Sequence, residues 1–468
     1  MKKLIVFLSL IAISAVGMLS IAERTAHMQK GTEVDNSRPD ANWTLTGSLG
    51  TGRTGHTATL LPNGKVLVAG GSFNNTVLNS AELYDPTTGL WTPTGNMDGG
   101  RTYHTATLLP DGKVLIVGGE TSLGGPGINW TELYNPTTGQ FSSTNNRLTT
   151  GRYRHTATLL SNGKVLIAGG EGATGSLKST EIYDPATFLW APSNDMVTAR
   201  GGHTATLLVG GKVLAAGGFN AGYLGSSEIY DPGTGNWTAT GSFSPARNAH
   251  TATRLVNGNV LIAGGYNNGD LKSALLFDSA LGTWTPTNDL LTARSSHSAT
   301  QLLTQTGQVL IAGGSNGANQ LNSAELYTPS TGTWSSTANM NQARSSYPAV
   351  LFSDGKVLAV GGNNLTSTEQ YDPVTIVFDT FEGDVVDASG GPNGDGQILS
   401  NDVSMIRQFA LGLATPVTPS NQFQRADING VCGDGAINSA DVTVVRLILL
   451  GSVFPTPACG PTSLTIAQ

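Results

Sequence analysis

The sequence predicts an all-β fold made of seven similar four-stranded units that close into a ring. One motif of about fifty residues recurs seven times between Arg53 and Pro373, and a period of this length indicates an array of packed units. Charged residues make up only 12% of the chain, against about 25% in ordinary soluble proteins. Glycine accounts for 61 of the 468 residues, which suits many short strands joined by tight turns.

The first two strands of each unit are predicted as a hairpin. In the first copy the run from His56 to Leu61 is turned back by Pro62-Asn63-Gly64 into a second run from Lys65 to Ala69. Asn-Gly between such runs predicts a two-residue turn with positive φ at both central positions. The matching dipeptides are Asp111-Gly112, Asn162-Gly163, Gly210-Gly211, Asn257-Gly258, Thr306-Gly307 and Asp354-Gly355.

The second strand ends at a Gly-Gly pair, which allows a close approach of neighbouring backbones or a sharp exit. The seven pairs lie at 70–71, 118–119, 169–170, 217–218, 264–265, 313–314 and 361–362. The third strand is Glu-Leu-Tyr-Asp-Pro or a near variant, and we expect the fourth strand to begin at the aromatic residue that follows.

The count of these aromatic residues predicts how the array ends. Six aromatic residues follow the seven Gly-Gly pairs, so one pair lacks an aromatic residue after it. The six are Trp91, Phe141, Trp190, Trp237, Trp284 and Trp334. A seventh, Trp43, lies before the first copy in a segment that closely matches the one around Trp91. The N-terminal segment is therefore expected to supply the outer strand of the last unit. This closure gives a seven-bladed β-propeller without exposed sheet edges.

The Gly-Gly, Tyr and Trp pattern of residues 43–376 resembles the kelch repeat, the blade of the galactose oxidase central domain and of many binding proteins. The resemblance implies the propeller fold but is weak for activity, because propellers carry unrelated functions. Galactose oxidase chemistry needs a Cys crosslinked to a Tyr, and residues 23–431 contain no Cys. Copper-radical oxidation is therefore disfavoured, and whether the chain is an enzyme stays open, with binding favoured.

Residues that recur in every blade are interpreted as structural. His56, His104, His155, His203, His250 and His297, with Tyr347 in the seventh copy, are expected to be hydrogen-bonding anchors between neighbouring blades. The Arg three residues earlier and the Glu of the third strand suggest an ion-pair or capping network that holds blades together. The alternative is an Arg-lined channel mouth that attracts anionic ligands.

Few features of the propeller depart from the repeat. The second blade has a longer loop, Ser122 to Trp130, whose unpaired Trp130 could stack on a sugar ring or cover a blade edge. We assign no catalytic residue. A glycosidase-like site stays open, because two carboxylates that converge from separate loops leave no linear motif.

The C-terminal region contains a second duplication. Asp395–Gly412 aligns without gaps to Asp434–Gly451, with nine of eighteen positions identical. Each half is an acidic Asp-Gly turn followed by an apolar-periodic helix that ends at Gly. A loop of Asp and Asn oxygens suits Ca²⁺, which takes six to eight oxygen ligands.

This duplication resembles the type I dockerin, a small α-helical, EF-hand-like module that docks onto cohesin domains. The resemblance implies two Ca²⁺ ions as cofactors, although both loops depart from the family pattern through extra residues. The implied ligands are Asp384 or Asp387, Asn393, Asp395, Gln397 and Asp402 in the first loop, and Asp427, Asn429, Asp434, Ala436 and Asp441 in the second. The implied cohesin contacts are Ser400, Asn401, Ser439 and Ala440, and a calcium-stabilised module without any cohesin is the alternative.

The N-terminus predicts export. Lys2 and Lys3 precede an apolar run from Leu4 to Ile21 with small residues for cleavage, as in a secretory signal peptide, with a retained anchor as the minor alternative. No other segment could span a bilayer. The two cysteines of the chain, Cys432 and Cys459, favour an intramolecular disulfide in an exported protein, although their spacing cannot prove it. The net charge of −7 without a basic stripe makes nucleic acid an unexpected partner.

The expected organisation is therefore a signal peptide (1–22), a polar linker (23–42), the propeller (43–376), a short linker (377–382), the dockerin-like module (383–451) and a tail (452–468). We expect a secreted or cell-surface protein that binds a glycan or a protein through its propeller. A carbohydrate-active enzyme, an O-glycosyl hydrolase in polysaccharide catabolism, and a purely structural surface protein are the alternatives.

Overall fold

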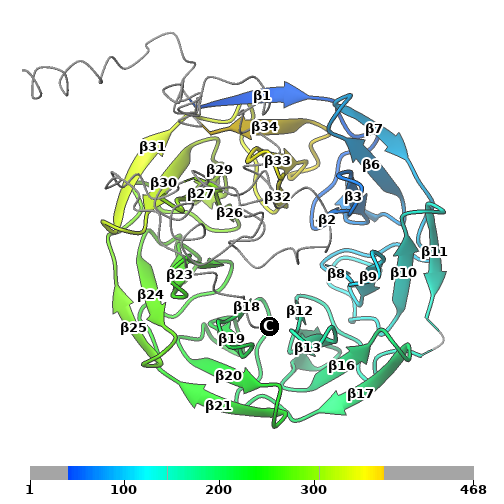
Figure 1. Cartoon of the computed structure of the whole chain (residues 1–468), viewed down its shortest axis with the longest axis horizontal. Helices are drawn as coiled ribbons and strands as arrows, with labels where there is room; N and C mark the ends of the chain where they lie inside the picture. The colour runs from blue at the N-terminus through cyan, green and yellow to red at the C-terminus, as the bar shows by residue number, and fades with distance from the viewer. Residues whose placement is uncertain (1–40, 145, 305, 374–468) are drawn as a thin grey trace, which may run out of the picture. The chain divides into compact units, whose positions relative to one another are not determined.

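Seven four-stranded antiparallel sheets surround one axis in the computed structural model, which describes residues 41–144, 146–304 and 306–373 (Figure 1). No helix occurs within these ranges. The prediction of an all-β, seven-bladed propeller is confirmed. The expected dockerin-like module, with its calcium ligands, cohesin contacts and cysteines, lies outside the described residues, as does the predicted signal peptide.

Each blade consists of four consecutive strands, except that the last blade takes its outer strand from the start of the described chain. The blades are β2 (Thr57–Leu60), β3 (Val66–Ala69), β6 (Ala81–Asp85), β7 (Leu90–Pro93); β8 (Thr105–Leu108), β9 (Val114–Val117), β10 (Thr131–Asn135), β11 (Gln140–Ser143); β12 (Thr156–Leu159), β13 (Val165–Ala168), β16 (Thr180–Asp184), β17 (Leu189–Ser193); β18 (Thr204–Leu207), β19 (Val213–Ala216), β20 (Ser227–Asp231), β21 (Asn236–Thr240); β22 (Thr251–Arg254), β23 (Val260–Ala263), β24 (Ala274–Asp278), β25 (Thr283–Pro286); β26 (Ser298–Gln301), β27 (Val309–Ala312), β30 (Ala324–Thr328), β31 (Thr333–Thr337); and β32 (Ala349–Leu351), β33 (Val357–Val360), β34 (Thr368–Asp372), β1 (Asn42–Thr46).

The first strand of every blade lies nearest the axis and contacts the first strand of the next blade, and β32 contacts β2 to close the circle (Figure 1). Three blades carry an additional short hairpin after the second strand: β4 (Ser72–Phe73) with β5 (Thr76–Val77), β14 (Glu171–Gly172) with β15 (Gly175–Ser176), and β28 (Ser315–Asn316) with β29 (Asn319–Gln320). Because strands two and four run in the same direction, these hairpins and the connections between blades share one face of the propeller. This face is called the connection face below.

The ring closes as the aromatic count predicts. Strand β1 pairs antiparallel with β34, and Trp43 lies opposite Tyr371 with their ring centroids 5.1 Å apart. Trp43 is buried in the cluster formed by the last two blades. The same Tyr–Trp cross-strand pair joins the third and fourth strands of other blades, for example Tyr84 and Trp91. Each outer strand begins one residue before its aromatic residue, so the expected starting point is one residue late.

The core lies between the blades. Every second strand is buried at all four positions, which explains its unbroken apolar sequence. Each blade packs this strand against its neighbour, as Val66 and Val68 of the first blade pack with Leu358 and Val360 of the last. Since no blade covers its own apolar face alone, stability depends on the closed array.

The turn between the first two strands differs from the prediction. Gly64 has φ 80°, whereas Asn63 is absent from the residues with positive φ. The Gly64 amide donates to the Leu61 carbonyl (2.9 Å) and the Leu61 amide donates to Lys65 (2.8 Å), which defines a three-residue loop ending in a left-handed glycine. The expectation of positive φ at both central positions is wrong here, because the loop has three residues and only its last one, Gly64, needs left-handed backbone.

The Gly-Gly pairs serve both of their expected purposes. Gly70 and Gly71 have φ 62° and 90°, and the Gly71 amide donates to the Arg101 carbonyl of the next blade (2.9 Å). A methyl group on Gly70 would lie 2.5 Å from that carbonyl oxygen. The pair therefore turns the chain sharply and allows two backbones to touch.

The described part of the chain contains no helix long and apolar enough to cross a membrane.

Candidate functional site

The recurring Arg residues are buried and paired within their own blades. All seven guanidinium side chains are 0% exposed, so they do not line a channel and the Arg-lined mouth is ruled out. Arg200 illustrates the pattern: it lies 2.6 Å from a carboxylate oxygen of Glu228 and donates to the Gly217 and Ser226 carbonyls. The equivalent pairs are Arg53–Glu82, Arg101–Glu132, Arg152–Glu181, Arg294–Glu325 and Arg344–Glu369.

The carboxylate of each pair also binds the chain that arrives from the preceding blade. The Val197 and Thr198 amides donate to Glu228 at 2.6 and 2.9 Å, and the other five Glu residues accept comparable amide bonds. The ion pair is therefore internal to one blade, and its attachment to the neighbour is through backbone amides. The predicted network exists in this form.

The six His residues join neighbouring blades. Five of them place Nε2 2.9–3.1 Å from a Thr hydroxyl of the preceding first strand, as His104 does with Thr57. His56 bonds instead to the Val360 carbonyl across the closure, and the Tyr347 hydroxyl takes the same role with Ser298. Burial lowers the pKa of all six, to about 3 for His104, His203 and His250. The prediction of hydrogen-bonding anchors is confirmed.

A second ring of residues surrounds the axis on the connection face, directly before the His series. These seven residues all have left-handed backbone, with φ from 50° to 65°: Gly55, Tyr103, Arg154, Gly202, Ala249, Ser296 and Ser346. Six amide-to-carbonyl bonds of 2.9–3.4 Å connect them from blade to blade, such as Arg154 to Tyr103. The backbone is therefore the same at all seven positions, while the side chains differ.

These differences make the opening of the axis asymmetric. We call this opening the mouth; it comprises the seven ring residues, the residues before them and those directly after each Gly-Gly pair. In the sixth, seventh and first blades the mouth has small polar residues: Ser295, Ser296, Ser315, Ser345, Ser346, Asn363, Thr54, Gly55 and Ser72. In the second to fifth blades it has, beside Thr102, Gly201, Gly202, Asn248 and Ala249, the larger or charged residues Tyr103, Glu120, Tyr153, Arg154, Glu171, Phe219 and Tyr266.

The polar part of the mouth is centred on Arg154. Its guanidinium lies 4.6 Å from the centre of the Tyr103 ring and 5.9 Å from that of Tyr153. Burial raises the pKa of both Glu120 and Glu171, while the charge of Arg154 opposes the rise. Burial, with the charges of both carboxylates, also raises the pKa of Tyr153. Two acids, one cation and two phenols thus share one electrostatic environment.

The two carboxylates differ in access. Glu120 is only 2% exposed, and its carboxylate accepts the Gly124 amide at 3.1 Å. Glu171 is half-buried and packs tightly on Gly201, where a methyl group would lie 2.0 Å from its Oε1. The absence of a side chain at Gly201 therefore creates the space that Glu171 occupies.

The apolar residues of the mouth, Phe219 and Tyr266, contact the neighbouring Tyr223, and these three aromatic residues are called the aromatic ridge. Their centroids are 5.5 and 5.9 Å apart in edge-to-face contacts that cross from the fourth blade to the fifth. Phe219 and Tyr266 are 38% and 39% exposed. Exposed rings beside a polar cluster can stack on an apolar face while neighbouring groups bond to polar atoms.

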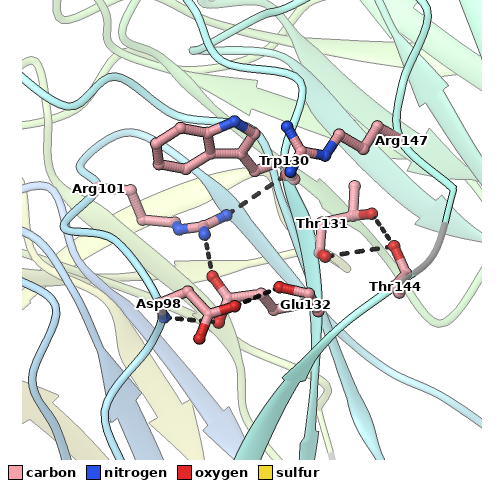
Figure 2. A pocket seen from close by; sticks show the side chains of 8 residues that line it. Asp98, Arg101, Trp130, Thr131, Glu132, Thr144 and Arg147 are labelled. Carbon is pink, nitrogen blue, oxygen red and sulfur yellow. Dashed lines mark hydrogen bonds and ion pairs between the residues drawn. The ribbon is translucent and has the colours of Figure 1, made fainter.

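Trp130, the predicted ligand contact, lies elsewhere. It lines a small hollow of about 160 Å³ with Asp98, Arg101, Glu132 and Arg147, where its ring lies beside the exposed Arg147 (Figure 2). A methyl group on Gly99 would lie 2.6 Å from the indole, so the ring covers the connection between the first two blades. The hollow is smaller than the 300–1,000 Å³ of ordinary ligand sites. Packing accounts for Trp130, and ligand binding by it stays a prediction.

No group of three or more His, Cys, Asp or Glu side chains within the described ranges is arranged to hold a metal ion. The predicted calcium ligands, from Asp384 to Asp441, all lie outside those ranges, so their geometry remains a matter of sequence.

Sequence reasoning missed the mouth. Tyr153, Arg154, Glu171, Phe219 and Tyr266 belong to no motif, because they occupy the positions where the copies disagree. One pattern could have located them: positions that adjoin the repeated His and Gly-Gly residues yet vary from copy to copy.

Comparison with protein families agrees with this architecture. The KLHDC2/KLHL20/DRC7 Kelch-repeats domain matches residues 55–242, and the Kelch motif matches residues 300–341. The Dockerin type I domain matches residues 392–450, inside the expected range 383–451. Of the proposed calcium ligands, Asp384 and Asp387 precede the matched segment. No curated protein matches the sequence significantly.

Comparison with solved structures supports the fold through one match with a TM-score above 0.5. A structure described as a novel fungal alcohol oxidase with catalytic diversity among the AA5 family, in complex with copper, has a TM-score of 0.59 and 18% identity. The match covers 72% of this chain and 77% of that one. A structure of YjhT has a TM-score of 0.49 and 17% identity, over 62% of this chain and 99% of that one. At 18% identity the likeness to the oxidase concerns the fold alone. Two segments of the seven-bladed propeller thus match kelch-repeat models, residues 55–242 and 300–341, and residues 392–450 match the Dockerin type I domain.

Proposed function

We propose that this protein is an exported binding protein whose propeller holds a glycan or protein ligand and whose dockerin segment attaches it to a cohesin-type partner. The observation that carries the binding role is the asymmetry of the mouth. Seven copies repeat their structural residues, yet one half of the mouth has acids, an Arg and exposed aromatic rings while the other has small polar residues. A purely structural ring has no need of this difference.

The tether is proposed to depend on Ca²⁺. The family match covers Asn393, Asp395 and Asp402 of the first loop and Asp427 and Asp434 of the second. Carboxylate and amide oxygens in Asp-Gly turns are the donors that Ca²⁺ prefers, and bound calcium orders such loops. We infer two ions, one in each loop, and contact with the partner through Ser400, Asn401, Ser439 and Ala440.

The tether is tested by calcium-dependent capture from the native secretome. The full chain should retain a cohesin-type protein in Ca²⁺ and release it in a chelator. The double variant Asp395→Ala/Asp434→Ala should retain none. In calorimetry, the chelator should lower the melting temperature of the dockerin segment and leave that of the propeller unchanged. The double variant should lack the calcium-dependent transition. Capture that is equal with and without Ca²⁺ contradicts the calcium tether.

The ligand role is tested in the presence of chelator, so that the tether is silent. Variants Tyr266→Ala and Glu171→Gln should lose a saturable ligand that the unaltered chain binds. Phe188→Ala is the matched control, because Phe188 is an aromatic residue 47% exposed in the turn between β16 and β17, on the opposite face. A purely structural protein would bind no saturable ligand in any form.

A carbohydrate-active enzyme is the second candidate, favoured by the two carboxyl groups with raised pKa at one mouth. Glycoside hydrolysis uses a pair of carboxyl groups, one as acid and the other as base or nucleophile. If the protein is an O-glycosyl hydrolase, it should release new reducing ends from a polysaccharide. Glu120→Gln and Glu171→Gln should then each abolish turnover. Binding without turnover supports the binding protein.

Export is proposed on the N-terminal pattern, and extracellular or cell-surface location agrees with where dockerin modules occur. N-terminal sequencing of the exported chain should find cleavage after Ala22. A mass shift of alkylated protein upon reduction should reveal whether Cys432 and Cys459 are joined. Retention of residues 1–22 in a membrane fraction would instead indicate an anchor.

A further inference from the structure

We propose that the mouth binds a neutral glycan chain, whose sugar rings stack on the aromatic ridge while their hydroxyl groups bond to Glu171, Arg154 and Tyr153. This inference rests on the proposed binding role of the propeller and names its ligand class. The supporting observation is that the apolar and polar parts of the mouth adjoin. The contacts of one side chain show this.

That side chain is Ser176. Its hydroxyl lies 3.1 Å from both carboxylate oxygens of Glu171 and 2.9 Å from the Phe219 carbonyl oxygen, so it can donate to either residue. Gly201, which pairs its backbone with Phe219, is also the residue against which Glu171 packs. The Glu171 carboxylate and the backbone of Phe219, the first residue of the aromatic ridge, are thus held together by the third and fourth blades.

The aromatic ridge is fixed before any ligand arrives. The Phe219 amide donates to the Gly201 carbonyl (2.9 Å), and the Tyr266 amide donates to Asn248 (2.8 Å). The aromatic side chains of Phe219 and Tyr266 therefore extend from backbone that is hydrogen-bonded to Gly201 and Asn248, next to the axis. A preorganised aromatic surface loses little conformational entropy when a ligand stacks on it.

The chemistry of the mouth favours a neutral polyhydroxylated ligand over a charged one. A sugar ring offers an apolar face to aromatic rings and hydroxyl groups that both donate and accept. The mouth provides a carboxylate acceptor, a guanidinium donor and a phenol that does both. An anionic polymer would meet the half-buried carboxyl group of Glu171, and a cationic peptide would meet the exposed guanidinium of Arg154.

The small half of the mouth has short side chains on the same backbone. Ser296 and Ser346 have the same left-handed backbone as Tyr103, with φ 53°, 51° and 53°. A tyrosine is therefore compatible with the backbone at these positions, where serine has a smaller side chain. This equivalence offers a variant that closes the mouth without changing the aromatic ridge.

The test measures affinity of the full chain for soluble neutral polysaccharides, with xyloglucan, galactomannan and mixed-linkage β-glucan as probes, by affinity electrophoresis and calorimetry. Tyr266→Ala and Phe219→Ala should each weaken binding of the recognised probe by about tenfold, as expected for loss of one stacking ring. Glu171→Gln should weaken it, and Ser346→Tyr should block entry. Phe188→Ala should leave affinity unchanged, and melting curves should match for every variant.

Binding of none of the probes, or binding that is equal in Tyr266→Ala, Phe219→Ala and the unaltered chain, overturns the proposal. A protein ligand that is lost in the same variants also overturns the glycan assignment, while the binding role of the mouth survives. Failure of calcium-dependent capture bears on the tether alone. The outcomes therefore separate the ligand class from the proposed function.

Discussion

At the scale of single residues, the buried Arg of each repeat has two kinds of partner. A Glu carboxylate balances its charge, and carbonyl groups of its own blade accept its hydrogen bonds. The fifth blade is the exception, because Leu275 replaces Glu there. Pro245 stands where Thr198 of the fourth blade donates an amide to Glu228, so a carboxylate would lack one of its partners. Arg247 keeps its carbonyl partners and lies 5.7 Å from the Phe243 ring, and burial without a paired acid lowers its pKa to about 10.

Glu228→Gln should lower the free energy of unfolding by about 3 kcal/mol, because it leaves the guanidinium of Arg200 buried without a counter-charge. Denaturant midpoints of the variant and the unaltered chain measure the change. The control is Asp195→Asn, which breaks the exposed pair between Lys178 and Asp195 and should change little. Equal effects of the two substitutions would contradict a structural role for the buried pairs.

The buried His residues make stability depend on pH. Their pKa is lowered by burial to about 3 for three of them, below the ordinary 6.5. The unfolded chain therefore binds more protons between these values, so stability is complete above about pH 6.5 and falls as pH drops toward 3. Tyr347 occupies the equivalent position in the seventh blade without such a titration.

His203→Tyr should reduce the acid sensitivity of the propeller. Thr156 of the third blade bonds to His203 as Ser298 of the sixth blade bonds to Tyr347, and Met196 precedes Arg200 by four residues as Met340 precedes Arg344, so the substitution has a precedent in the fold. Melting temperatures from pH 7 to pH 3 should fall less steeply in the variant than in the unaltered chain. Parallel curves would show that His203 contributes nothing to the acid transition.

At the scale of elements, glycine has two different roles. Some glycines fit a turn that needs left-handed backbone, and others allow two blades to touch. Gly64 has left-handed φ with nothing within 4 Å of a methyl group, whereas a methyl on Gly70 would lie 2.5 Å from the Arg101 carbonyl oxygen. The first requires only a permissive backbone, and the second requires empty space between two blades.

Gly64→Ala should therefore cost about 1–2 kcal/mol from backbone strain alone. Gly70→Ala should cost about 3 kcal/mol or more, because strain and overpacking add. Denaturant midpoints of the two variants compare them directly. A larger loss of stability for Gly64→Ala than for Gly70→Ala would mean that the structure around Gly70 shifts easily to accommodate a methyl group.

At the scale of the whole molecule, the ring is closed by β1, which lies far in sequence from the other three strands of its sheet. Strand β1 covers β34, and the interface between the last and first blades includes Val350, Phe352, Val66 and Val68. Without β1 the last blade would have three strands and an exposed edge, which is a template for aggregation.

A chain that begins at Ser48 should melt at a lower temperature and aggregate, while one that begins at Asp40 and keeps β1 should melt as the full chain does. Trp43→Ala should reproduce part of the loss, about 3–5 kcal/mol, since it removes a buried aromatic residue from the closure. Calorimetry and light scattering measure both. An undisturbed transition in the Ser48 chain would contradict closure by β1.

Much of the fold follows from repeated residues. The buried second strands, the Gly-Gly pairs and the pairing of Trp43 with Tyr371 could all be predicted, because each reflects a contact made in every blade. The hairpin turn was predicted with the wrong geometry, since the loop has three residues and not two. The mouth escaped prediction because Tyr103 and Arg154 are 51 residues apart and neither belongs to the repeat.

The sequence by itself determined the blade, the number of blades and the closure, because periodic residues encode contacts that recur within a blade and between neighbours. Only the tertiary structure decided which variable residues meet. The axis gathers variable positions from all seven copies, and the chemistry of Glu171, Arg154 and the aromatic ridge arises from their meeting there. No local pattern carries that information, because these side chains come together only when the ring has closed.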